Sequence, residues 1–517
     1  MTAPVPRRTA LRSAAALAVG SVALAGTGAA CAPAGDRSRP SPPSGSSRSH
    51  LAPDGAHTVV PAAVPRAGVV EAGDSLHDQS LAASRALLDR ASAVVVAPTP
   101  DDVGAGTATA RRLGLPLLVA GPGLSAELDR LGVRTVVREA APGGPGDSLA
   151  GDRQVVTSAD TDALERLPGL PLRPTAHAGA GVLAPDAPLP PGVEATLDAV
   201  GADRIQLQHS DPRLAPEAFG ALRAGAGPVL GVGAALGPAE RLAQRVRTVR
   251  HAEELPGGGY LPFPGRRMVA LYGHPGTASL GMLGEQSASD AVVRATTLAT
   301  EYAALTDTPV VPAFELIATV AARSAGADGS YSRRTPVERL LPWVEAAEGA
   351  GAYAVLDLQP GRTDFLEQAQ HYEELLRRPW VGLALDPEWR LWGDQVHLEQ
   401  IGSVGVDEVN RVGRWLAGLV REHDLPPKVL TLHQFRPSMV RDRARLDTSL
   451  DEIQWLVHAD GLGSQDDKQA TWRALRRDLP PGVWLGWKNF EDEDTPMLTP
   501  RQTMARVSPT PWFVSYQ

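Results

Sequence analysis

Aromatic residues are nearly absent from the first half of the chain. All ten tryptophans and all seven tyrosines follow residue 259, and the one phenylalanine before that point is Phe219. The first half must therefore build its interior from Ala, Val and Leu. Aromatic side chains bury the most area per residue and are the usual platforms for ligands. The asymmetry predicts two domains of different kinds, with the chemistry in the second.

Cysteine and excess positive charge are also lacking. The chain has 517 residues and one cysteine, so no disulfide can form within it. Its net charge of −9 gives no electrostatic reason to expect a nucleic-acid partner, which requires a basic surface. The chain is long enough for two or more hydrophobic cores.

The single cysteine ends a segment, residues 1–31, with the layout of an export signal. Arg7, Arg8 and Leu11 match the twin-arginine pattern, and residues 13–30 carry no charge. The sequence Gly28-Ala29-Ala30-Cys31 resembles a bacterial lipobox, although Gly28 stands where Leu is usual. The resemblance implies an exported lipoprotein of the actinobacterial type, anchored to the membrane by a lipid on Cys31.

The alternative for this segment is simple cleavage near the same position. A retained membrane helix is not expected, because the run is rich in Ala and falls short of the ~20 strongly apolar residues that a span needs. Residues 32–57 are rich in Pro, Ser, Gly and Arg. Such a composition cannot bury enough surface to offset its ordering entropy, so it predicts a disordered tether.

Between residues 58 and 255, strands of small aliphatic residues alternate with helices. Ala93–Ala97 is a continuous apolar run, typical of a strand buried on both faces. Further strands are expected over 115–119 and 134–137, with helices over 105–113 and 124–131. This alternation predicts an α/β domain with a doubly wound parallel sheet.

The same domain resembles the bacterial cell-wall-binding repeat of type 2. The resemblance rests on Ala93–Ala97, on Gly114-Leu115-Pro116-Leu117-Leu118 and on the helix end Leu128–Gly132. The upstream Ala-Gly-x-x-Arg-Tyr segment of the family is echoed by Ala72-Gly73-Asp74-Ser75, without the Arg-Tyr pair. A weaker second unit covers residues 225–249. The resemblance implies a cell-wall or envelope polysaccharide as partner.

A glycine-rich loop lies within that second unit. Gly231, Gly233 and Gly237 are spaced almost as in a dinucleotide-binding loop, in which glycines let the backbone approach a pyrophosphate. The spacing differs by one residue, and no acidic partner for a ribose is evident. We therefore interpret the loop as a turn and expect no cofactor.

Residues 256–517 have the length and rhythm of a (β/α)₈ barrel, which typically takes about 250 residues. Gly257-Gly258-Gly259 separates this part from the first domain. Helices are expected over 288–305, 336–348, 364–377 and 406–423. Eight apolar segments predict the strands of the barrel: 268–272, 310–314, 352–356, 381–385, 429–432, 453–457, 483–487 and 512–515.

Polar residues stand at the carboxyl ends of these strands, where barrel enzymes place their reactive groups. We expect them to converge at one mouth. Glu315 and Asp357 have apolar neighbours on both sides, which predicts desolvated carboxyls with raised pKa values. The strand-end residues are, in chain order, Tyr272, His274, Glu315, Asp357, Gln359, Asp386, Glu388, Trp389, His433, Gln434, His458, Asp460, Lys488, Glu491 and Tyr516.

This set of acids and aromatics best suits cleavage of a glycosidic bond, which needs two carboxyls facing each other across a sugar. The barrel resembles bacterial glycoside-hydrolase-like barrels, which take the acid from strand four and the second carboxyl from strand seven. The resemblance implies Glu388, or Asp386, as the acid and Glu491 as its partner. The usual Asn-Glu of strand four is Pro387-Glu388 here.

The other candidates are assigned by residue type. Glu315 and Asp357 complete the catalytic candidates, and Trp392 is a further aromatic platform for sugar rings. The predicted substrate-binding residues are Tyr272, His274, Gln359, Trp389, His433, His458, Asp460, Trp487 and Lys488.

Several candidates have a structural alternative. Asp386 can cap a turn at Pro387, Asp357 can pair with Arg362, and residues 491–494 can form a solvated acidic loop. Five further residues are expected in helix packing or on helix surfaces: Trp343, Trp415, Trp472, His397 and His423.

Histidines and acids at one mouth could also ligate a metal such as Zn²⁺. The candidates are His274, Glu315, His433, His458 and Asp460, but no closely spaced ligand motif is present, so no metal is expected. The sequence thus predicts an exported, lipid-anchored envelope protein whose barrel acts on or binds a glycan. A non-catalytic glycan-binding protein and a metal-dependent hydrolase are the alternatives.

Overall fold

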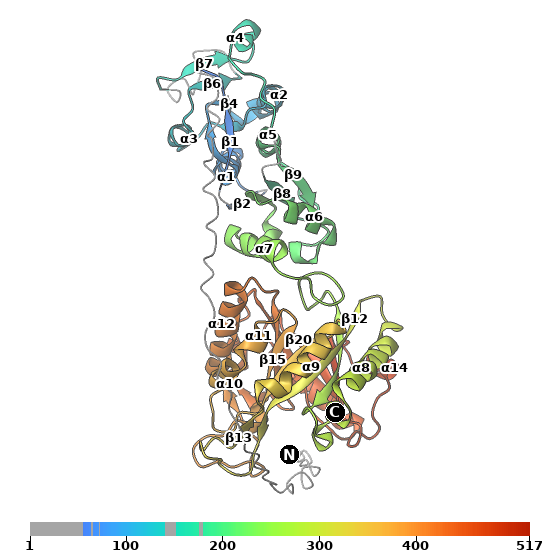
Figure 1. Ribbon diagram of the computed structural model, residues 1–517. Helices are drawn as coiled ribbons and strands as arrows, with labels where there is room; N and C mark the ends of the chain where they lie inside the picture. The colour runs from blue at the N-terminus through green and yellow to red at the C-terminus, as the bar shows by residue number, and fades with distance from the viewer. Residues whose placement is uncertain (1–54, 64–65, 72, 140–150, 175–178) are drawn as a thin grey trace, which may run out of the picture.

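The computed structural model describes residues 55–63, 66–71, 73–139, 151–174 and 179–517, and it has two parts joined end to end (Figure 1). The export segment, Cys31 and residues 32–54 of the predicted tether lie outside the described residues. Within the described ranges, no helix combines the length and the apolar character needed to cross a bilayer.

The first part contains two four-stranded parallel sheets, each with helices around it. One sheet has the strand order β5-β4-β6-β7 and the other has the order β9-β8-β10-β2. The first sheet consists of β4 (Ala93–Ala97), β5 (Leu117–Val119), β6 (Thr135–Arg138) and β7 (Gln154–Thr157). The second consists of β2 (Ala67–Val70), β8 (Ala180–Leu183), β9 (Asp203–Gln206) and β10 (Val229–Val232). The predicted parallel α/β architecture is confirmed.

One strand crosses between the two sheets. β2 leads through α1 (Leu76–Leu87) into the first sheet, yet it pairs with β10 of the second. β4 to β7 follow one another in the chain and form the first sheet, and α4 (Thr161–Glu165) leads from β7 to the second sheet. The second sheet is therefore completed by a strand that precedes the first sheet in the chain.

The helices of the two units occupy matching places in the chain. The first unit has α2 (Val103–Leu113) and α3 (Leu124–Leu131), and the latter ends at Gly132 in the left-handed conformation that glycine adopts readily. The second has α5 (Pro191–Val200), α6 (Pro216–Ala224) and α7 (Ala239–His251). The segment 225–249 is thus the last strand and helix of a longer unit, and its glycine-rich loop forms a turn before α7.

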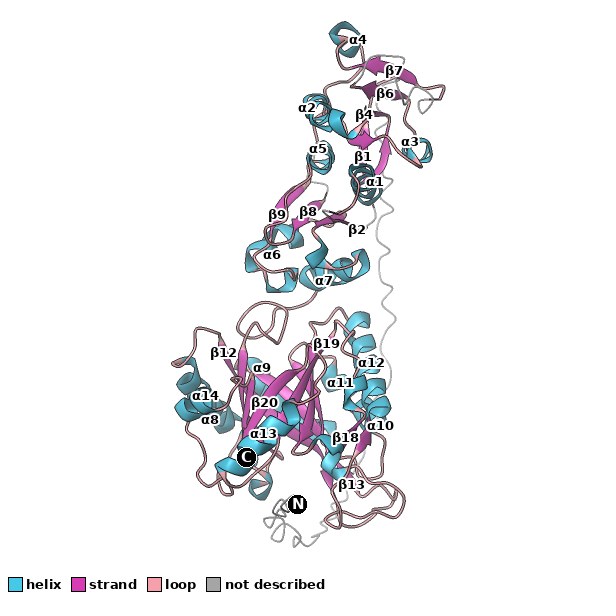
Figure 2. Ribbon diagram, turned by 180° about the vertical axis from the view of Figure 1, so that it is seen from behind, coloured by secondary structure: helices cyan, strands magenta, loops and turns pink. Residues whose placement is uncertain are grey.

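The second part is a closed barrel of eight parallel strands (Figure 2). All eight predicted strands are present, each shifted by a few residues at most except β12, which extends further. They are β11 (Arg267–Gly273), β12 (Val310–Ala321), β14 (Tyr353–Leu358), β15 (Val381–Leu385), β17 (Lys428–Gln434), β19 (Ile453–Ala459), β20 (Trp484–Asn489) and β21 (Phe513–Tyr516).

Helices surround this barrel. The helix predicted over 364–377 is broken at Tyr372 into two, and the other predicted helices are present. The described helices are α8 (Ala288–Ala303), α9 (Val337–Gly349), α10 (Phe365–His371), α11 (Glu373–Leu376), α12 (Val406–Glu422), α13 (Gln465–Arg476) and α14 (Pro500–Arg506).

Side chains alternate along each strand between the helix layer and the barrel interior. The interior is apolar in its lower half, near the amino-terminal ends of the strands. Leu255 and Phe263 pack into this apolar floor from the segment before β11. Gly257, Gly258 and Gly259 reverse the chain there, with φ values of 83°, 87° and 73° that favour glycine. The floor residues of the strands are Met268, Ala270, Ala313, Tyr353, Val355, Ala384, Val429, Leu456 and Phe513.

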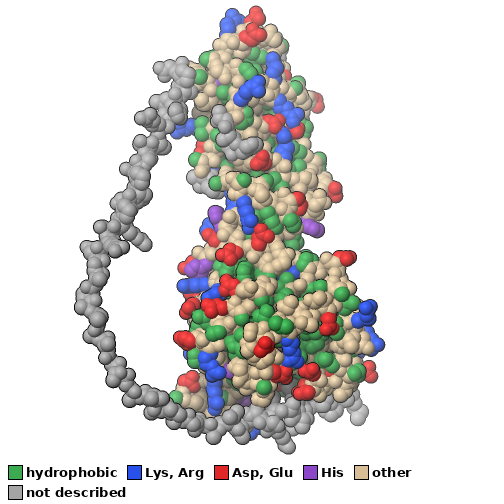
Figure 3. Space-filling model, turned by 45° about the vertical axis from the view of Figure 1, so that its right-hand side comes forward, with side chains coloured by type: hydrophobic (Ala, Val, Ile, Leu, Met, Phe, Trp, Pro, Cys, Tyr) green, Lys and Arg blue, Asp and Glu red, His purple; other side chains and the backbone are tan. Residues whose placement is uncertain are grey.

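The first part contacts the amino-terminal end of the barrel, and ion pairs join the two. Figure 3 shows the two parts in contact, with charged side chains of both signs near the junction. Asp451, just before β19, lies 2.9 Å from Arg213 and 2.8 Å from Arg245 of α7. The Arg213 side chain is only 3% exposed, so its charge depends on these partners. The carboxyl ends of the strands consequently face away from the first part (Figure 1).

We expect Asp451→Asn to lower the free energy of unfolding by roughly 1–3 kcal/mol, because it strips one carboxylate from a buried guanidinium. Asp424→Asn is the matched control. It breaks the more exposed pair with Arg247 and should cost under about 1 kcal/mol. Urea unfolding of both variants measures the difference, and equal losses would contradict the role given to Asp451.

Candidate functional site

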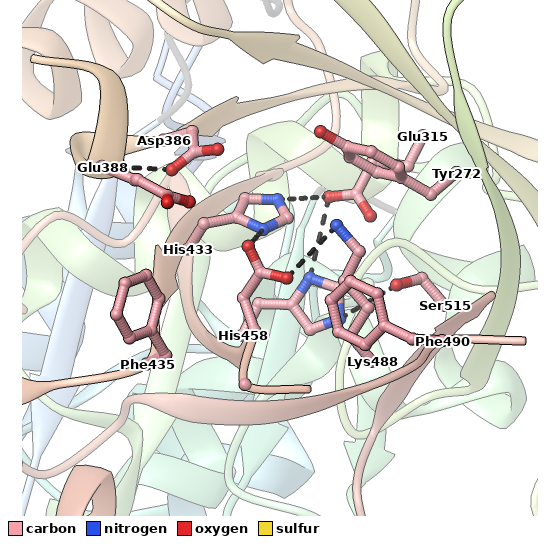
Figure 4. A network of polar contacts seen from close by, with 12 residues as sticks. Tyr272, Glu315, Asp386, Glu388, His433, Phe435, His458, Lys488, Phe490 and Ser515 are labelled. Atoms are coloured by element: carbon pink, nitrogen blue, oxygen red, sulfur yellow. Dashed lines mark hydrogen bonds and ion pairs between the residues drawn. The ribbon is translucent and has the colours of Figure 1, made fainter. Parts of the chain in front are cut away.

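The upper half of the barrel interior is polar. Figure 4 shows part of this network, with Glu315, His433 and His458 pointing toward one another. Because inward positions recur every second residue, polar side chains follow the apolar floor residues along the strands, as Glu315 follows Ala313 and Ser515 follows Phe513. These side chains are almost completely buried. They are Tyr272, Glu315, Asp357, Asp386, His433, His458, Asp460, Lys488 and Ser515. The structure therefore brings together most of the residues that the sequence selected.

An ion pair between Glu315 and His433 lies at the centre of this layer. The Nε2 atom of His433 is 2.8 Å from Oε1 of Glu315, and neither side chain is exposed. Burial alone would lower the pKa of His433, but the Glu315 carboxylate raises it well above its ordinary value. Burial alone would raise the pKa of Glu315, but His433 and His458 hold it far below the usual range.

The raised pKa predicted for Glu315 is therefore wrong, because the sequence does not reveal that a histidine faces it. The same prediction is confirmed for Asp357. Burial raises the pKa of Asp357 to about 6 against the opposing effect of His433. Its Oδ2 atom accepts a hydrogen bond from the Tyr272 hydroxyl at 2.9 Å, and no pair with Arg362 forms among the described contacts.

Asp460 lies between two basic groups. Its Oδ2 atom is 3.4 Å from Nδ1 of His433, and its Oδ1 atom is 3.2 Å from Nζ of Lys488. The Lys488 ammonium also lies 3.3 Å from the centre of the Tyr272 ring. Two cations against one buried carboxyl favour its ionised form.

Asp386 has the opposite environment. It follows β15, is 2% exposed, and accepts a hydrogen bond at 3.1 Å from the backbone N–H of Glu388. The turn-capping alternative for Asp386 is thus observed. Burial, followed by the charge of Asp357, raises the pKa of Asp386 well above its ordinary value. The environment of this carboxyl therefore favours its neutral form.

A charge count explains why one acid stays neutral. Burial lowers the pKa of His458, whose Nε2 lies 3.1 Å from the Ser515 hydroxyl, so His458 is neutral. Two cations, His433 and Lys488, then face four buried carboxyls. The four are Glu315, Asp357, Asp386 and Asp460. A low-dielectric interior does not tolerate two uncompensated negative charges, so protons must be retained. Asp386 retains one, and Asp357 is the next to take one as the pH falls.

A pocket of about 600 Å³ opens above this layer at the carboxyl ends of the strands. Its floor consists of four residues of the polar layer together with Gln359. Its walls include Trp389, His397 and Phe490, and charged side chains stand at its rim. The floor residues are Tyr272, Gln359, Asp386, Asp460 and Lys488. Four residues of the polar layer do not line the pocket and influence it only through their contacts with the floor residues. They are Glu315, Asp357, His433 and His458.

Glu491 does not reach this pocket. Its side chain is 50% exposed and lies 3.5 Å from Arg294 of α8. The pairing of Glu388 with Glu491 across a sugar is therefore corrected. Asp460 takes that place, since oxygens of Asp386, Glu388 and Asp460 lie within 4.8 Å of one another.

Two aromatic candidates also lie elsewhere. Trp487 points outward between strand and helix, with its ring centre 5.7 Å from that of Trp472 on α13. Lys488, one residue later, is the inward position of the same strand. Trp392 is 41% exposed and stacks under Arg390 at 4.0 Å, outside the residues that line the pocket.

Two histidines differ from the prediction: His274 is expected in the pocket and His397 outside it, and the structure shows the opposite. His274 is buried between the hydroxyls of Thr277 and Thr335 and does not line the pocket. His397, expected on a helix surface, is buried, hydrogen bonds to the carbonyl of Tyr331, and does line the pocket. No helix is present at His397, because Gly393 and Leu398 adopt positive φ angles there.

The remaining predictions concern packing. Trp343 and Trp472 belong to the core between helices and barrel, Trp415 packs against it, and Tyr516 pairs with Tyr302 through their hydroxyls. Sequence reasoning missed Ser515 and several pocket residues, although two-residue alternation from Phe513 identifies Ser515. Ser515 belongs to the buried polar layer beside His458, and the pocket residues are Phe490, Arg323, Arg333, Asp492 and Glu493.

Two groups of ligand atoms among the described residues lie close enough together to hold a metal ion. Glu315, His433 and His458 lie close enough together, but a protonated His433 offers no lone pair, so this group does not fit. Asp386, Glu388 and Asp460 form the second group, where the Lys488 ammonium already stands beside Asp460. A cation there would have to displace that contact.

No protein-family model matches the chain, and no curated protein matches it. Among solved structures, the chain is similar to an endo-beta-N-acetylglucosaminidase from Cordyceps militaris in apo form. The sequence identity is 12%, the match covers 49% of this chain and 81% of that chain, and the TM-score is 0.23. The function therefore has to be argued from the chemistry of the site.

His433→Gln should lower the free energy of unfolding at pH 7 by roughly 3–5 kcal/mol, because Glu315 is left buried without a cation. The contribution of His433 is full below pH 6.5, the ordinary histidine pKa, and is lost as the pH rises through the raised pKa. That of Glu315 is full above pH 4.5 and is lost as the pH falls through the lowered pKa.

Adding Glu315→Gln to His433→Gln should restore part of that loss, since the double variant buries neither charge. Urea unfolding of the two single variants and the double variant gives the coupling energy. Additive losses would show that the pair does not act as described.

Proposed function

We propose that the barrel is a glycoside hydrolase that cleaves a glycan in the pocket above Asp386 and Asp460. One observation carries the proposal: Asp386 and Asp460 line the same pocket, and their carboxyl oxygens lie within 4.8 Å of each other. Glycosidic cleavage needs such a pair, one to protonate the leaving oxygen and one to stabilise or attack the sugar carbon.

Asp386 is the general acid in this proposal. Its pKa is raised, so it can donate a proton to the departing oxygen and later take one back from water. Asp460 is the second carboxylate, with Lys488 and His433 keeping it ionised. Glu388, which the sequence favoured as the acid, belongs to the same group of oxygens and is the alternative donor.

The spacing favours retention of configuration. Oxygens of the three carboxyls lie within 4.8 Å of one another. Retaining enzymes separate their carboxyls by ~5–5.5 Å, whereas inverting enzymes need ~6.5–9.5 Å to admit a water. Tyr272, Trp389 and Phe490 give the pocket aromatic faces for sugar rings.

The cellular setting is also part of the proposal. The export signal and the lipobox-like Cys31 support an exported protein held at the outer face of the membrane. The resemblance of the first domain to cell-wall-binding repeats supports contact with an envelope polysaccharide. Because that domain docks on the amino-terminal end of the barrel, the pocket opens away from it.

A metal-dependent hydrolase is the competing function, favoured by the group formed by Asp386, Glu388 and Asp460. The contact of Lys488 with Asp460 argues against it. Stoichiometric divalent metal in the purified protein, with activity lost on chelation, would decide for the metal enzyme.

Asp386→Asn should reduce turnover of a cleaved glycan by roughly 10²–10⁴-fold, because the variant has no proton to donate. Asn can still accept the hydrogen bond from Glu388, so the pocket keeps its shape and glycan binding should change little. The assay uses the full chain with a panel of envelope glycans, reading new reducing ends for turnover and calorimetry for binding.

Glu491→Gln discriminates between the two carboxyl pairs and should retain full activity. Loss of activity in Glu491→Gln, with Asp386→Asn unaffected, would overturn the assignment. Glycan binding without any hydrolysis by the unaltered protein would identify a non-catalytic binding protein instead.

A further inference from the structure

The rim of the pocket carries charges of opposite sign on opposite sides. β12 continues beyond the barrel and forms a hairpin with β13 (Ser332–Arg334). Arg323 and Arg333, at this hairpin, line the pocket on one side. Asp492 and Glu493, in the loop after β20, line it as well.

Strand register directs Arg333 toward the pocket. Arg333 lies directly opposite Val320 in the antiparallel hairpin, and directly opposed residues point to the same face. Val320 also lines the pocket. Arg334, the next residue, therefore points to the other face, where it lies 2.5 Å from Glu367 of α10.

The two rim arginines have no acidic partner among the described residues. Other exposed arginines of the barrel, such as Arg334, Arg377 and Arg411, form an ion pair with a nearby carboxylate but do not line the pocket. Both rim arginines are exposed, and they stand at a concave site in a chain of net charge −9. General basicity therefore does not explain them.

A guanidinium presents its donors as a planar fork that matches a carboxylate or a phosphate. A neutral sugar offers no such group. We propose that the pocket takes an anionic glycan, whose carboxylate or phosphate binds Arg323 and Arg333. This inference rests on the proposed glycoside hydrolase function, and it specifies the class of glycan that the pocket binds.

The charge distribution also orients the ligand. Asp492 and Glu493 repel an anion at the far side of the rim, so the acidic group lies at the β12–β13 hairpin. The bond to be cut then lies over Asp386 and Asp460 at the centre of the floor.

Binding is measured by calorimetry with full-length Asp386→Asn as the background, so that affinity is read without turnover. The probes are hyaluronan oligosaccharides, which carry carboxylates, glycerol-phosphate teichoic acid, which carries phosphates, and neutral chitin oligosaccharides. Arg323→Gln with Arg333→Gln should weaken binding of an anionic probe by roughly tenfold or more, and added salt should weaken binding to the background protein.

Arg334→Gln is the matched control, one residue away on the opposite face, and should bind like the background. Preference for hyaluronan or for teichoic acid identifies the carboxylate or the phosphate as the group bound. Equal loss in Arg334→Gln, no loss in the double variant, or no binding of either anionic probe would overturn the inference.

The outcomes separate this inference from the proposed function. Hydrolysis of neutral glycans without charge preference would sink the inference and leave the hydrolase intact. If the protein binds an anionic glycan through the two arginines but never cleaves it, the inference stands and the proposed hydrolase function is wrong.

Discussion

Charge balance inside the barrel is the constraint on which the site depends. Four carboxyls are buried with two cations, and the Glu315–His433 pair satisfies one carboxyl so completely that His433 stays charged. His433 and Lys488 then stabilise Asp460 as an anion, and no cation is left for Asp386. This charge balance explains why the neutral form is favoured for Asp386 and the carboxylate form for Asp460 on the same pocket floor.

The rest of the molecule makes that balance possible. The apolar floor below the polar layer, completed by Leu255 and Phe263, keeps water out from beneath and so keeps the interior of low dielectric. Ion pairs at Asp451 fix the first domain to the same end of the barrel, away from the pocket. The pairing of β2 with β10 joins the two units of that domain.

The strands could be predicted because each is an apolar run that ends in polar residues. These apolar runs do not show which of their residues point into the barrel. Glu491 and Trp487 were assigned to the pocket, but one lies beyond β20 and the other faces α13, while Lys488 between them faces inward. Counting by twos from the apolar floor residues would have made this distinction.

Other features depend on contacts between distant residues, and no local pattern encodes them. The lowered pKa of Glu315 arises from His433, which is more than one hundred positions away. The pairing of β2 with β10 joins segments that lie even farther apart in the chain. Arg323 and Arg333 read as ordinary surface residues until the hairpin of β12 and β13 places them at the rim.

Neutron diffraction from deuterated crystals at pH 7 would test the central claim most directly, because it locates the protons themselves. The account predicts deuterium on both ring nitrogens of His433 and on the carboxyl of Asp386, with none on Glu315 or Asp460. A neutral His433 beside an ionised Asp386 would contradict it.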